Sequence, residues 1–319
     1  MKQELPGIIF FGTPEFAIPS LRALVKGGVP VKIVVTKPDR KKGRGQRLSA
    51  PPVKELALEF GLECYQPESL KEAEVLEKLG NLKADCLVVV AYGEIIPKEL
   101  IELTPMGAIN VHPSLLPKYR GAAPIQRAIM AGENETGVTI MLLDEGMDSG
   151  PILNQKKIKI EPYHNLGVLH DELAKLGAEL LVDTLEKYYR GELKPVPQDH
   201  DRATFAPPIR KEECEIDWER TSREICNLIR AVDPIPGAYT YWDNTLLKLY
   251  SPRVENISLS GKPGEVAESA PHGLLVTTGD RCGVRIREVQ LAGQRRMTFA
   301  EFARGKGKKL VPGVVLGGR

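Results

Sequence analysis

The alternation of short apolar runs with amphipathic stretches, over the first half of the chain, most constrains what this sequence can fold into. The apolar runs occupy residues 8–11, 31–35, 86–91, 108–112 and 137–142, and helical patterns lie around 15–26, 52–60, 69–79 and 122–131. This alternation is typical of βαβ units that share a parallel sheet. The sequence therefore predicts an α/β fold with a Rossmann-like, mostly parallel sheet in an N-terminal domain.

The chain also predicts a second, smaller domain of a different kind. Leucines at three- and four-residue spacings across 165–189 predict one long helix that closes the first domain. The next residues are rich in Pro and polar side chains and have no period, which is typical of a linker. A helical pattern at 221–232 then precedes closely spaced short strands, which favours a C-terminal, OB-like β-barrel. We expect a first domain over 1–189, a linker over 190–208 and a second domain over 209–319.

Composition excludes several classes of protein. No apolar run approaches the ~18–20 residues that a helix needs to span a bilayer, and residues 1–11 lack the pattern of a signal peptide. The five cysteines are scattered and never form a Cys-x-x-Cys pair, which argues against both a disulfide framework and a zinc site. The sequence therefore predicts a soluble protein of the reducing cytoplasm, with no membrane partner and no bound metal.

Three polar side chains stand out near predicted strand ends. Asn110 and His112 lie two residues apart in the pattern 108–112, so both project from one face at the strand's carboxyl end, where open α/β sheets bind ligands. Asp148 follows the next strand pattern in a turn bounded by two glycines, and we expect it opposite His112. An amide, an imidazole and a carboxylate in one crevice can stabilise an oxyanion and move protons. The same spacing also fits a turn-stabilising Asn and an ordinary surface His.

Basic residues gather in two regions that are far apart in the sequence. Between 37 and 47 there are six Lys or Arg residues and one Asp, and between 281 and 319 there are ten Lys or Arg residues and two Glu. The whole chain carries a net charge of only +2, so the remainder is acidic. One such run is usually a solvated loop or tail, but two of them favour a polyanionic partner such as nucleic acid.

Longer motifs resemble a known family. The run NVHPSLLPKYRGAAPIQRAI at 110–129 and the run ETGVTIMLLDEGMDSGPIL at 135–153 resemble the folate-dependent formyltransferases. The run TKPDRKKGRGQRLSAPPVKELA at 36–57 resembles the branch of that family that formylates methionyl-tRNA. The likeness covers nearly the whole chain. Some relatives carry Gly where this chain has Pro113, and that difference bears only on the conformation of the loop.

The resemblance implies a reaction and the residues that carry it. The reaction is transfer of the formyl group of 10-formyltetrahydrofolate to the α-amino group of methionyl initiator tRNA, for translation initiation. The family's catalytic trio falls on Asn110, His112 and Asp148. Its folate pocket falls on Ala91, Tyr92, Gly93, Ile95, Ser114, Leu115, Leu116, Pro117 and Asp144. Its tRNA-contacting loop falls on Arg40, Lys41, Lys42, Arg44 and Arg47, and the basic C-terminal region offers a second contact through Arg281, Arg285, Arg287, Arg295 and Arg296.

The basic loop at 37–47 also carries an expectation about its conformation. Gly43 and Gly45 loosen the backbone and the like charges repel one another, so we expect the loop to order only against tRNA. Two rival interpretations stay open. A formate-releasing hydrolase, or a formyltransferase for a nucleotide or sugar amine, would share the trio, but the basic loop argues against it. A nucleic-acid-binding module on an inactive α/β domain would explain the basic regions, but the intact trio argues against that.

Overall fold

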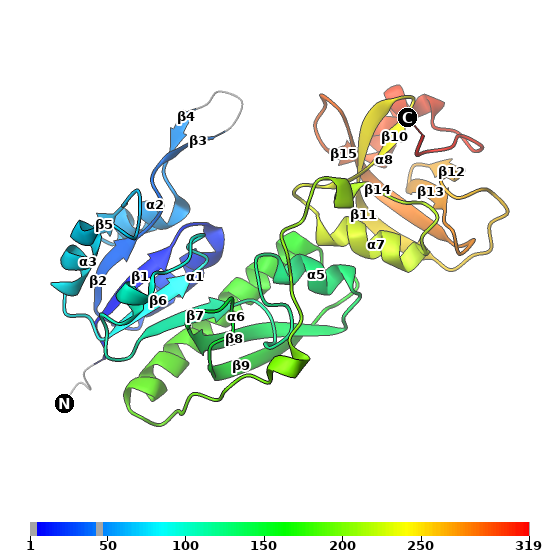
Figure 1. Cartoon of the computed structure of the whole chain (residues 1–319). Helices are drawn as coiled ribbons and strands as arrows, with labels where there is room; N and C mark the ends of the chain where they lie inside the picture. Colours follow the sequence, from blue (N-terminus) through cyan, green and yellow to red (C-terminus); the bar gives the residue numbers. More distant parts are fainter. Residues whose placement is uncertain (1–4, 43–46, 319) are drawn as a thin grey trace. The chain divides into compact units, whose positions relative to one another are not determined.

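The computed structural model describes residues 5–42 and 47–318. They fold into two compact units, and the chain crosses between the units more than once (Figure 1). The first unit comprises Met1–Gly121, Thr136–Ile158 and His170–Phe205, and the second comprises Ala122–Glu135, Lys159–Leu169 and Ala206–Arg319. The division expected from the sequence, into 1–189, 190–208 and 209–319, stays a prediction, because compactness alone does not show which ranges fold as domains.

The first unit is built on a seven-stranded sheet in the order β5-β2-β1-β6-β7-β8-β9. The strands are β1 (Ile8–Gly12), β2 (Val31–Val35), β5 (Cys64–Tyr65), β6 (Cys86–Val90), β7 (Ala108–His112), β8 (Glu135–Leu142) and β9 (Ile152–Lys159). The strands from β5 to β7 pair in parallel, and β8 runs antiparallel to β7. β1 and β6 are buried along their whole length, as strands covered on both faces must be. The predicted Rossmann-like, mostly parallel sheet is therefore confirmed.

Helices cover both faces of this sheet (Figure 1). They are η1 (Glu15–Ala17), α1 (Ile18–Lys26), α2 (Pro52–Glu59), α3 (Ala73–Gly80), α4 (Lys98–Ile101) and most of α6 (Leu166–Tyr189), and the short η2 (His200–Arg202) follows. α6 packs on β7 and β8, since a Cβ at Gly177 would lie 2.9 Å from Val111 and 3.4 Å from Val138. α3 and α4 lie on the opposite face, where their leucines join Ile9 and Phe11 in one buried cluster.

The basic segment forms a small structure of its own. β3 (Arg40–Lys42) and β4 (Arg47–Ser49) pair antiparallel as a two-stranded hairpin, separate from the large sheet (Figure 1). The sequence predicts a loop here, and the pairing of its two arms corrects that expectation. The sequence shows no period-2 alternation of apolar and polar residues here, because all but one of the residues in the two arms are polar or charged.

The second unit combines helices with an antiparallel sheet. The sheet follows the order β10-β11-β14-β13-β12, with β15 on β14. Its helix α7 is fixed at its start by a capping box between Thr221 and Glu224, and it buries Ile225 and Ile229 in the core of the unit. The elements are α5 (Pro124–Met130), η3 (Glu212–Cys214), α7 (Ser222–Ala231), β10 (Ala238–Trp242), β11 (Thr245–Glu255), β12 (Val266–Ala270), β13 (Gly273–Thr277), β14 (Gly283–Leu291), β15 (Met297–Thr298), α8 (Phe299–Arg304) and η4 (Lys306–Lys309).

The segment 313–317 joins the two outer strands of this sheet. It exchanges hydrogen bonds with Val266 of β12, at 2.8 and 2.9 Å, and the Gly317 N–H donates to the Tyr241 carbonyl of β10 at 2.9 Å. An antiparallel bridge also pairs Glu265 with Val315. The short strands that the sequence predicts are present, they form an antiparallel sheet, and the link between its edges is compatible with the predicted barrel. Closure as an OB-like barrel stays a prediction.

Candidate active site

Strand β7 carries Asn110 and His112 to the carboxyl edge of the large sheet. Asn110 is the register partner of Val89 in β6, and His112 is the partner of Thr139 in β8. Because side chains alternate along a strand, both residues face away from α6, which packs on Val111. Asn110 is half-buried, and His112 is only 4% exposed. The expectation that the two side chains share one face agrees with this geometry.

His112 has a neighbour at each ring nitrogen. Its Nε2 lies 2.9 Å from the Tyr119 carbonyl oxygen, and since a carbonyl oxygen only accepts, Nε2 carries a proton. Its Nδ1 lies 3.6 Å from Oδ2 of Asp148. That distance is too long for a hydrogen bond but short enough for strong attraction when the ring is charged. Nδ1 is therefore the nitrogen that can donate to a substrate or exchange a proton, and a carboxylate stands beside it.

The loop after β7 is closed on itself by hydrogen bonds. The Ser114 hydroxyl donates to the Lys118 carbonyl at 2.7 Å, and the Ser114 N–H donates to the His112 carbonyl at 2.9 Å. Pro113 has no N–H for the β-ladder, so the strand ends where the loop begins. Tyr119, which accepts from His112, has a φ of +62°. The loop thus folds back over the imidazole that precedes it.

Asp148 lies in the turn between β8 and β9. Its φ of +48° is in the left-handed region, which Asp tolerates better than most residues but which still costs free energy. Its Oδ2 accepts a 2.8 Å hydrogen bond from the Gly121 N–H, at the end of the loop after β7. Gly150 permits the turn, because a Cβ there would lie 2.0 Å from the Leu142 carbonyl oxygen. The structure thus places the carboxylate against His112, as the sequence predicts.

The residues predicted to bind folate divide into two groups. The first group is accessible: Ala91, Gly93, Ile95 and Asp144 are exposed, and Leu115 and Pro117 are partly exposed. The second group, which is buried, consists of Tyr92, Ser114 and Leu116. The more exposed members lie mainly on the loop after β6, and β6 and β7 are parallel neighbours. This loop and the loop after β7 therefore start from the same edge of the sheet. The buried members support the loops from behind and offer little surface to a ligand.

Tyr92 anchors the loop after β6. Its ring packs edge-on against Phe11, with centroids 5.4 Å apart, and the Lys37 ammonium lies 5.1 Å from its centroid. Burial raises the pKa of the Tyr92 hydroxyl, and a nearby Glu94 carboxylate acts in the same direction. Within 5–42 and 47–318 this hydroxyl has no hydrogen-bond partner. The Thr13 hydroxyl donates to the Tyr92 carbonyl at 2.9 Å, which ties the loops after β1 and β6 together.

Sequence reasoning missed the buried polar residues that support these loops. The Thr139 hydroxyl donates to the Ser114 carbonyl at 2.7 Å, and it accepts from the Leu116 N–H at 3.1 Å and from the Gln155 amide at 2.8 Å. Thr139 lies inside an apolar strand pattern, where Thr is common. Gln198, which contacts the turn of Asp148, lies in a segment without any period. Neither residue carries a signal in the sequence.

The base of the basic hairpin is held by specific contacts. Both Asp39 carboxylate oxygens lie 2.9 Å from the Lys54 ammonium, and the Gln66 amide donates to Asp39 at 2.8 Å. The hydrogen bond from Lys54 holds the pKa of Asp39 below its usual value. Lys37 forms an ion pair with Glu94. Arg40 and Lys41 are exposed, whereas Arg44 and the side chains of Lys42 and Arg47 lie outside the described part of the chain.

The C-terminal arginines do not form one free basic surface. Arg285 is only 8% exposed and pairs with Glu255 at 3.0 Å and Glu268 at 2.9 Å. These two acidic partners, on strands β11 and β12 of the same sheet, neutralise its charge inside the second unit. Its guanidinium is not available to phosphate, and the structure argues against Arg285 as a tRNA contact.

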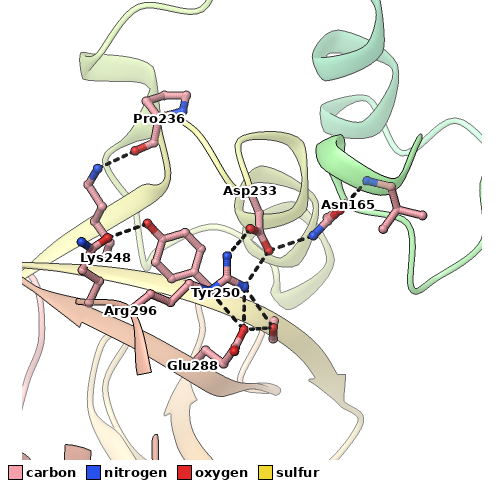
Figure 2. Close-up of polar contacts among 10 residues, drawn as sticks. Asn165, Asp233, Pro236, Lys248, Tyr250, Glu288 and Arg296 are labelled. Atoms are coloured by element: carbon pink, nitrogen blue, oxygen red, sulfur yellow. Dashed lines mark hydrogen bonds and ion pairs between the residues drawn. The ribbon is translucent and has the colours of Figure 1, made fainter. Parts of the chain in front are cut away.

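Arg296 is engaged in the same way (Figure 2). It donates to the buried Asp233 carboxylate at 2.6 Å and to Glu288 at 3.1 Å, and its guanidinium carbon lies 4.0 Å from the Tyr250 ring centroid. Asp233 also accepts from Asn165 at 3.0 Å. The structure therefore argues against Arg296 as a tRNA contact too. Arg281, Arg287 and Arg295 remain exposed, although Arg295 pairs with Glu301.

Comparison with known proteins places this geometry in a family. Residues 7–185 match the formyl transferase family and residues 208–307 match the formyl transferase C-terminal domain. The chain is 46% identical, over 97% of both chains, to a methionyl-tRNA formyltransferase of Desulforamulus reducens. It is 44% identical to a methionyl-tRNA formyltransferase of Staphylococcus aureus, over 95% of this chain and 99% of that one. The chain belongs to the methionyl-tRNA formyltransferase family.

Solved structures show that this formyltransferase shares its fold with more distant proteins. A sugar 3N-formyl transferase, WlaRD, solved in the presence of dTDP and 5-N-formyl-THF, matches with a TM-score of 0.67 at 20% identity, over 92% of this chain and 100% of that one. HypX from Aquifex aeolicus, in complex with tetrahydrofolic acid, matches with a TM-score of 0.64 at 19% identity. This match covers 97% of the present chain, which spans 48% of HypX.

Two features are absent from the described part of this formyltransferase. Across 5–42 and 47–318, no three His, Cys, Asp or Glu side chains come together in a way that could hold a metal ion. None of the helices in the same ranges combines the length and the apolar character that crossing a membrane requires.

Proposed function

We propose that this chain transfers the formyl group of 10-formyltetrahydrofolate to the α-amino group of methionyl initiator tRNA, giving N-formylmethionyl-tRNA for translation initiation. Membership in the methionyl-tRNA formyltransferase family supports the reaction. One observation carries the site assignment: Nδ1 of His112 lies 3.6 Å from the Asp148 carboxylate. Asn110 lies two residues before His112 on the same face of β7. An amide donor, an imidazole and a carboxylate are thus available at one edge of the sheet.

The trio has a distinct role for each side chain. In the reaction the amine nitrogen bonds to the formyl carbon, the bond from that carbon to the donor nitrogen breaks, and a proton moves from amine to donor. The Asn110 amide and the Nδ1–H of His112 donate to the formyl oxygen as negative charge develops on it. Asp148, 3.6 Å from Nδ1, orients the imidazole, and it accepts the surplus proton of the amine, directly or through water.

The loops after β6 and β7 fit the formyl donor. A Cβ added at Gly93 would meet nothing within 4 Å, and the Ile95 side chain is 86% exposed, so this loop offers open, partly apolar surface beside β7. Flat ring systems are commonly held by apolar side chains together with a few well-placed polar groups. The proposed folate-binding residues are Ala91, Tyr92, Gly93, Ile95, Ser114, Leu115, Leu116, Pro117 and Asp144, with the buried members of this group supporting the loops.

We assign tRNA binding to the exposed cations of both basic regions. In the basic segment these are Arg40 and Lys41, and the proposal extends to Lys42, Arg44 and Arg47, whose side chains lie outside the described part of the chain. In the second unit they are Arg281, Arg287, Arg295 and the lysines of η4. In this proposal 1–189 is the catalytic domain, 190–208 a linker and 209–319 the tRNA-binding domain. All five cysteines are free thiols, which fits a protein of the reducing cytoplasm.

A transfer assay tests the proposed reaction. Purified protein is incubated with labelled 10-formyltetrahydrofolate and with either methionine-charged initiator tRNA or methionine-charged elongator tRNA, and the label on the aminoacyl group is measured. Selective labelling of the initiator supports donor, acceptor and discrimination together. Release of formate alone, or labelling of neither tRNA, would refute the tRNA assignment.

Two substitutions test the site. Asn110→Ala and His112→Ala should each lower kcat by on the order of 10²–10³, because each removes one donor to the developing oxyanion. Asn81→Ala and His272→Ala are matched controls, since both residues are exposed, and they should leave kcat unchanged. Retention of most activity in both site variants would overturn the assignment of the trio.

A further inference from the structure

Gln198 is a buried side chain whose amide is fully used on the surroundings of Asp148. It lies before η2 in the segment between α6 and α7, and it is 5% exposed. Its Nε2 donates to the Asp148 carbonyl at 2.9 Å and to the Gly150 carbonyl at 2.7 Å. Its Oε1 accepts from Nε of Arg120 at 3.1 Å and from Nη2 of Arg120 at 2.7 Å. A primary amide has two donor protons and one acceptor oxygen, so its capacity is satisfied.

Arg120 connects Gln198 to the other side of Asp148. It is also 5% exposed, and it directly precedes Gly121, whose N–H donates to Oδ2 of Asp148 at 2.8 Å. The Arg120 N–H donates to the Thr204 carbonyl at 2.8 Å, further along the segment of Gln198. Gly121 therefore fixes the carboxylate of Asp148, and Gln198 fixes its backbone. Arg120 connects the two, because it precedes Gly121 in the chain and donates to the amide oxygen of Gln198.

The segment that carries Gln198 is itself fixed to the sheet. Val196 and Ile152 exchange two backbone hydrogen bonds of 2.8 Å, at the start of β9. Gln198 lies two residues beyond Val196, so a rigid strand end sets where its amide points. Asp148, by contrast, lies in a turn outside the strands and adopts a left-handed φ of +48°. A strained residue stays in place only when its surroundings fix it.

We propose that Gln198 is a positioning residue, which holds the turn of Asp148 so that the carboxylate stays against Nδ1 of His112. The inference rests on the proposed function, because it acts through the role given there to Asp148. Gln198 does not contact the reacting atoms. Its two hydrogen bonds to backbone carbonyls fix the turn, and Arg120 orients its amide. A small displacement of a catalytic group costs a large factor in rate, so loss of these donors should lower kcat and leave substrate binding intact.

Gln198→Glu is the sharpest perturbation. The side chain keeps its shape and can still accept from Arg120, but it loses both donors to the carbonyls of Asp148 and Gly150. We expect kcat to fall by about 10-fold or more, while KM for the formyl donor and KM for the tRNA stay within about twofold. Gln198→Met, which is similar in length and has no donor, should act in the same direction and serves if the Glu variant does not fold. All rates are measured well below each variant's melting temperature.

Gln290→Glu is the matched control. The Gln290 amide also donates to one backbone carbonyl, at 2.9 Å from Gln294, and accepts from one side chain, at 3.1 Å from the Tyr250 hydroxyl. It belongs to the second unit. We expect its kcat to equal that of the parent protein. A fall in kcat as large as that of Gln198→Glu would show that the rate responds to any lost amide donor, and this would overturn the proposal.

A double-mutant cycle separates failure of this inference from failure of the proposed function. Asp148→Asn is nearly isosteric, and single-turnover rates are measured for it with and without Gln198→Glu. If Gln198 acts through Asp148, the effect of Gln198→Glu on the rate should largely disappear when Asp148→Asn is also present. An undiminished effect in the double variant, or an unchanged kcat in Gln198→Glu alone, overturns the positioning role. A fully active Asp148→Asn variant instead overturns the proposed role of Asp148, on which the inference rests.

Discussion

Replacing Thr139 with Val removes one buried hydroxyl and keeps the shape of the side chain. In the structure that hydroxyl donates to the Ser114 carbonyl at 2.7 Å and accepts from the Leu116 N–H at 3.1 Å. Both backbone groups would lose their partner in the loop after β7. The Gln155 amide, which also donates to Thr139, would keep its 2.8 Å bond to the Leu116 carbonyl. The substitution therefore leaves two buried polar groups without their hydrogen-bond partner.

The size of the effect follows from that count. At about 1–2 kcal/mol for each buried group left without a partner, the free energy of unfolding should fall by about 2–4 kcal/mol. For a unit of this size the melting temperature should then drop by roughly 5–15 °C. We also expect KM for the formyl donor to rise, because the loop that loses these bonds contains Ser114, Leu115, Leu116 and Pro117.

Thr139→Ser provides the control, since it keeps the hydroxyl and removes only the methyl group. Both variants are followed by thermal unfolding and by steady-state kinetics over a range of donor concentrations. If Thr139→Val melts within about 2 °C of Thr139→Ser, the two backbone groups have found other partners. The predicted loss of stability from two unpaired backbone groups is then refuted.

Three further predictions concern charge. Arg296→Met should lower the free energy of unfolding by about 3–5 kcal/mol, because its buried carboxylate partner is left uncompensated, whereas exposed Arg295→Met should cost less than about 1 kcal/mol; equal urea midpoints for the two would contradict this. Arg40→Ala combined with Lys41→Ala should raise KM for tRNA and lower the slope of log KM against log salt concentration by about two, because two phosphate contacts are lost. An unchanged slope would exclude both residues as phosphate contacts. Burial raises the pKa of Cys86 from 9.0 to about 12, so its contribution to stability is complete below the unfolded value and is lost as pH rises toward 12. Cys86→Ala should therefore show a shallower alkaline loss in urea midpoint, and parallel profiles would argue against this cause.

Much of the first unit could be predicted from its sequence because its strands are buried on both faces. A strand such as β6 is then an unbroken apolar run, and its bounds in the structure, Cys86–Val90, differ from the predicted 86–91 by one residue. β9 could not be found in this way. Its sequence ILNQKKIK is largely solvated on the sheet's outer edge, so no apolar run marks it.

The residues of the candidate site that lie on a strand or in the turn after one could be predicted from the sequence. Those on segments without a repeat could not. The position of Asn110 and His112 follows from the two-residue repeat of β7, and Asp148 follows from the turn after β8. Gln198 reaches the same place from a segment with no repeat, fifty residues further along the chain. Only the tertiary structure brings it there.

The ion pairs of Arg285 and Arg296 could not be predicted from the sequence either. Arg285 and Arg296 add to the positive total of the C-terminal region, but the sequence does not reveal which acidic side chains face them across the sheet. Glu255 and Glu268 meet Arg285 from strands β11 and β12, which precede it in the chain. A count of charges over a window treats such an arginine as free, although its field is cancelled within a few ångströms.

The backbone link at 313–317 has a consequence for the behaviour of the protein at high concentration. An uncovered outer strand is a template for strand addition by another molecule, and this is a common route to aggregation. Here Val266 of β12 and Tyr241 of β10 already use backbone groups on the chain's own last segment. The segment 313–317 therefore occupies backbone groups of both outer strands that another molecule could otherwise pair with. Removing the residues from Gly313 onward would uncover both outer strands at once. We expect the shortened protein to self-associate at concentrations at which the parent protein does not.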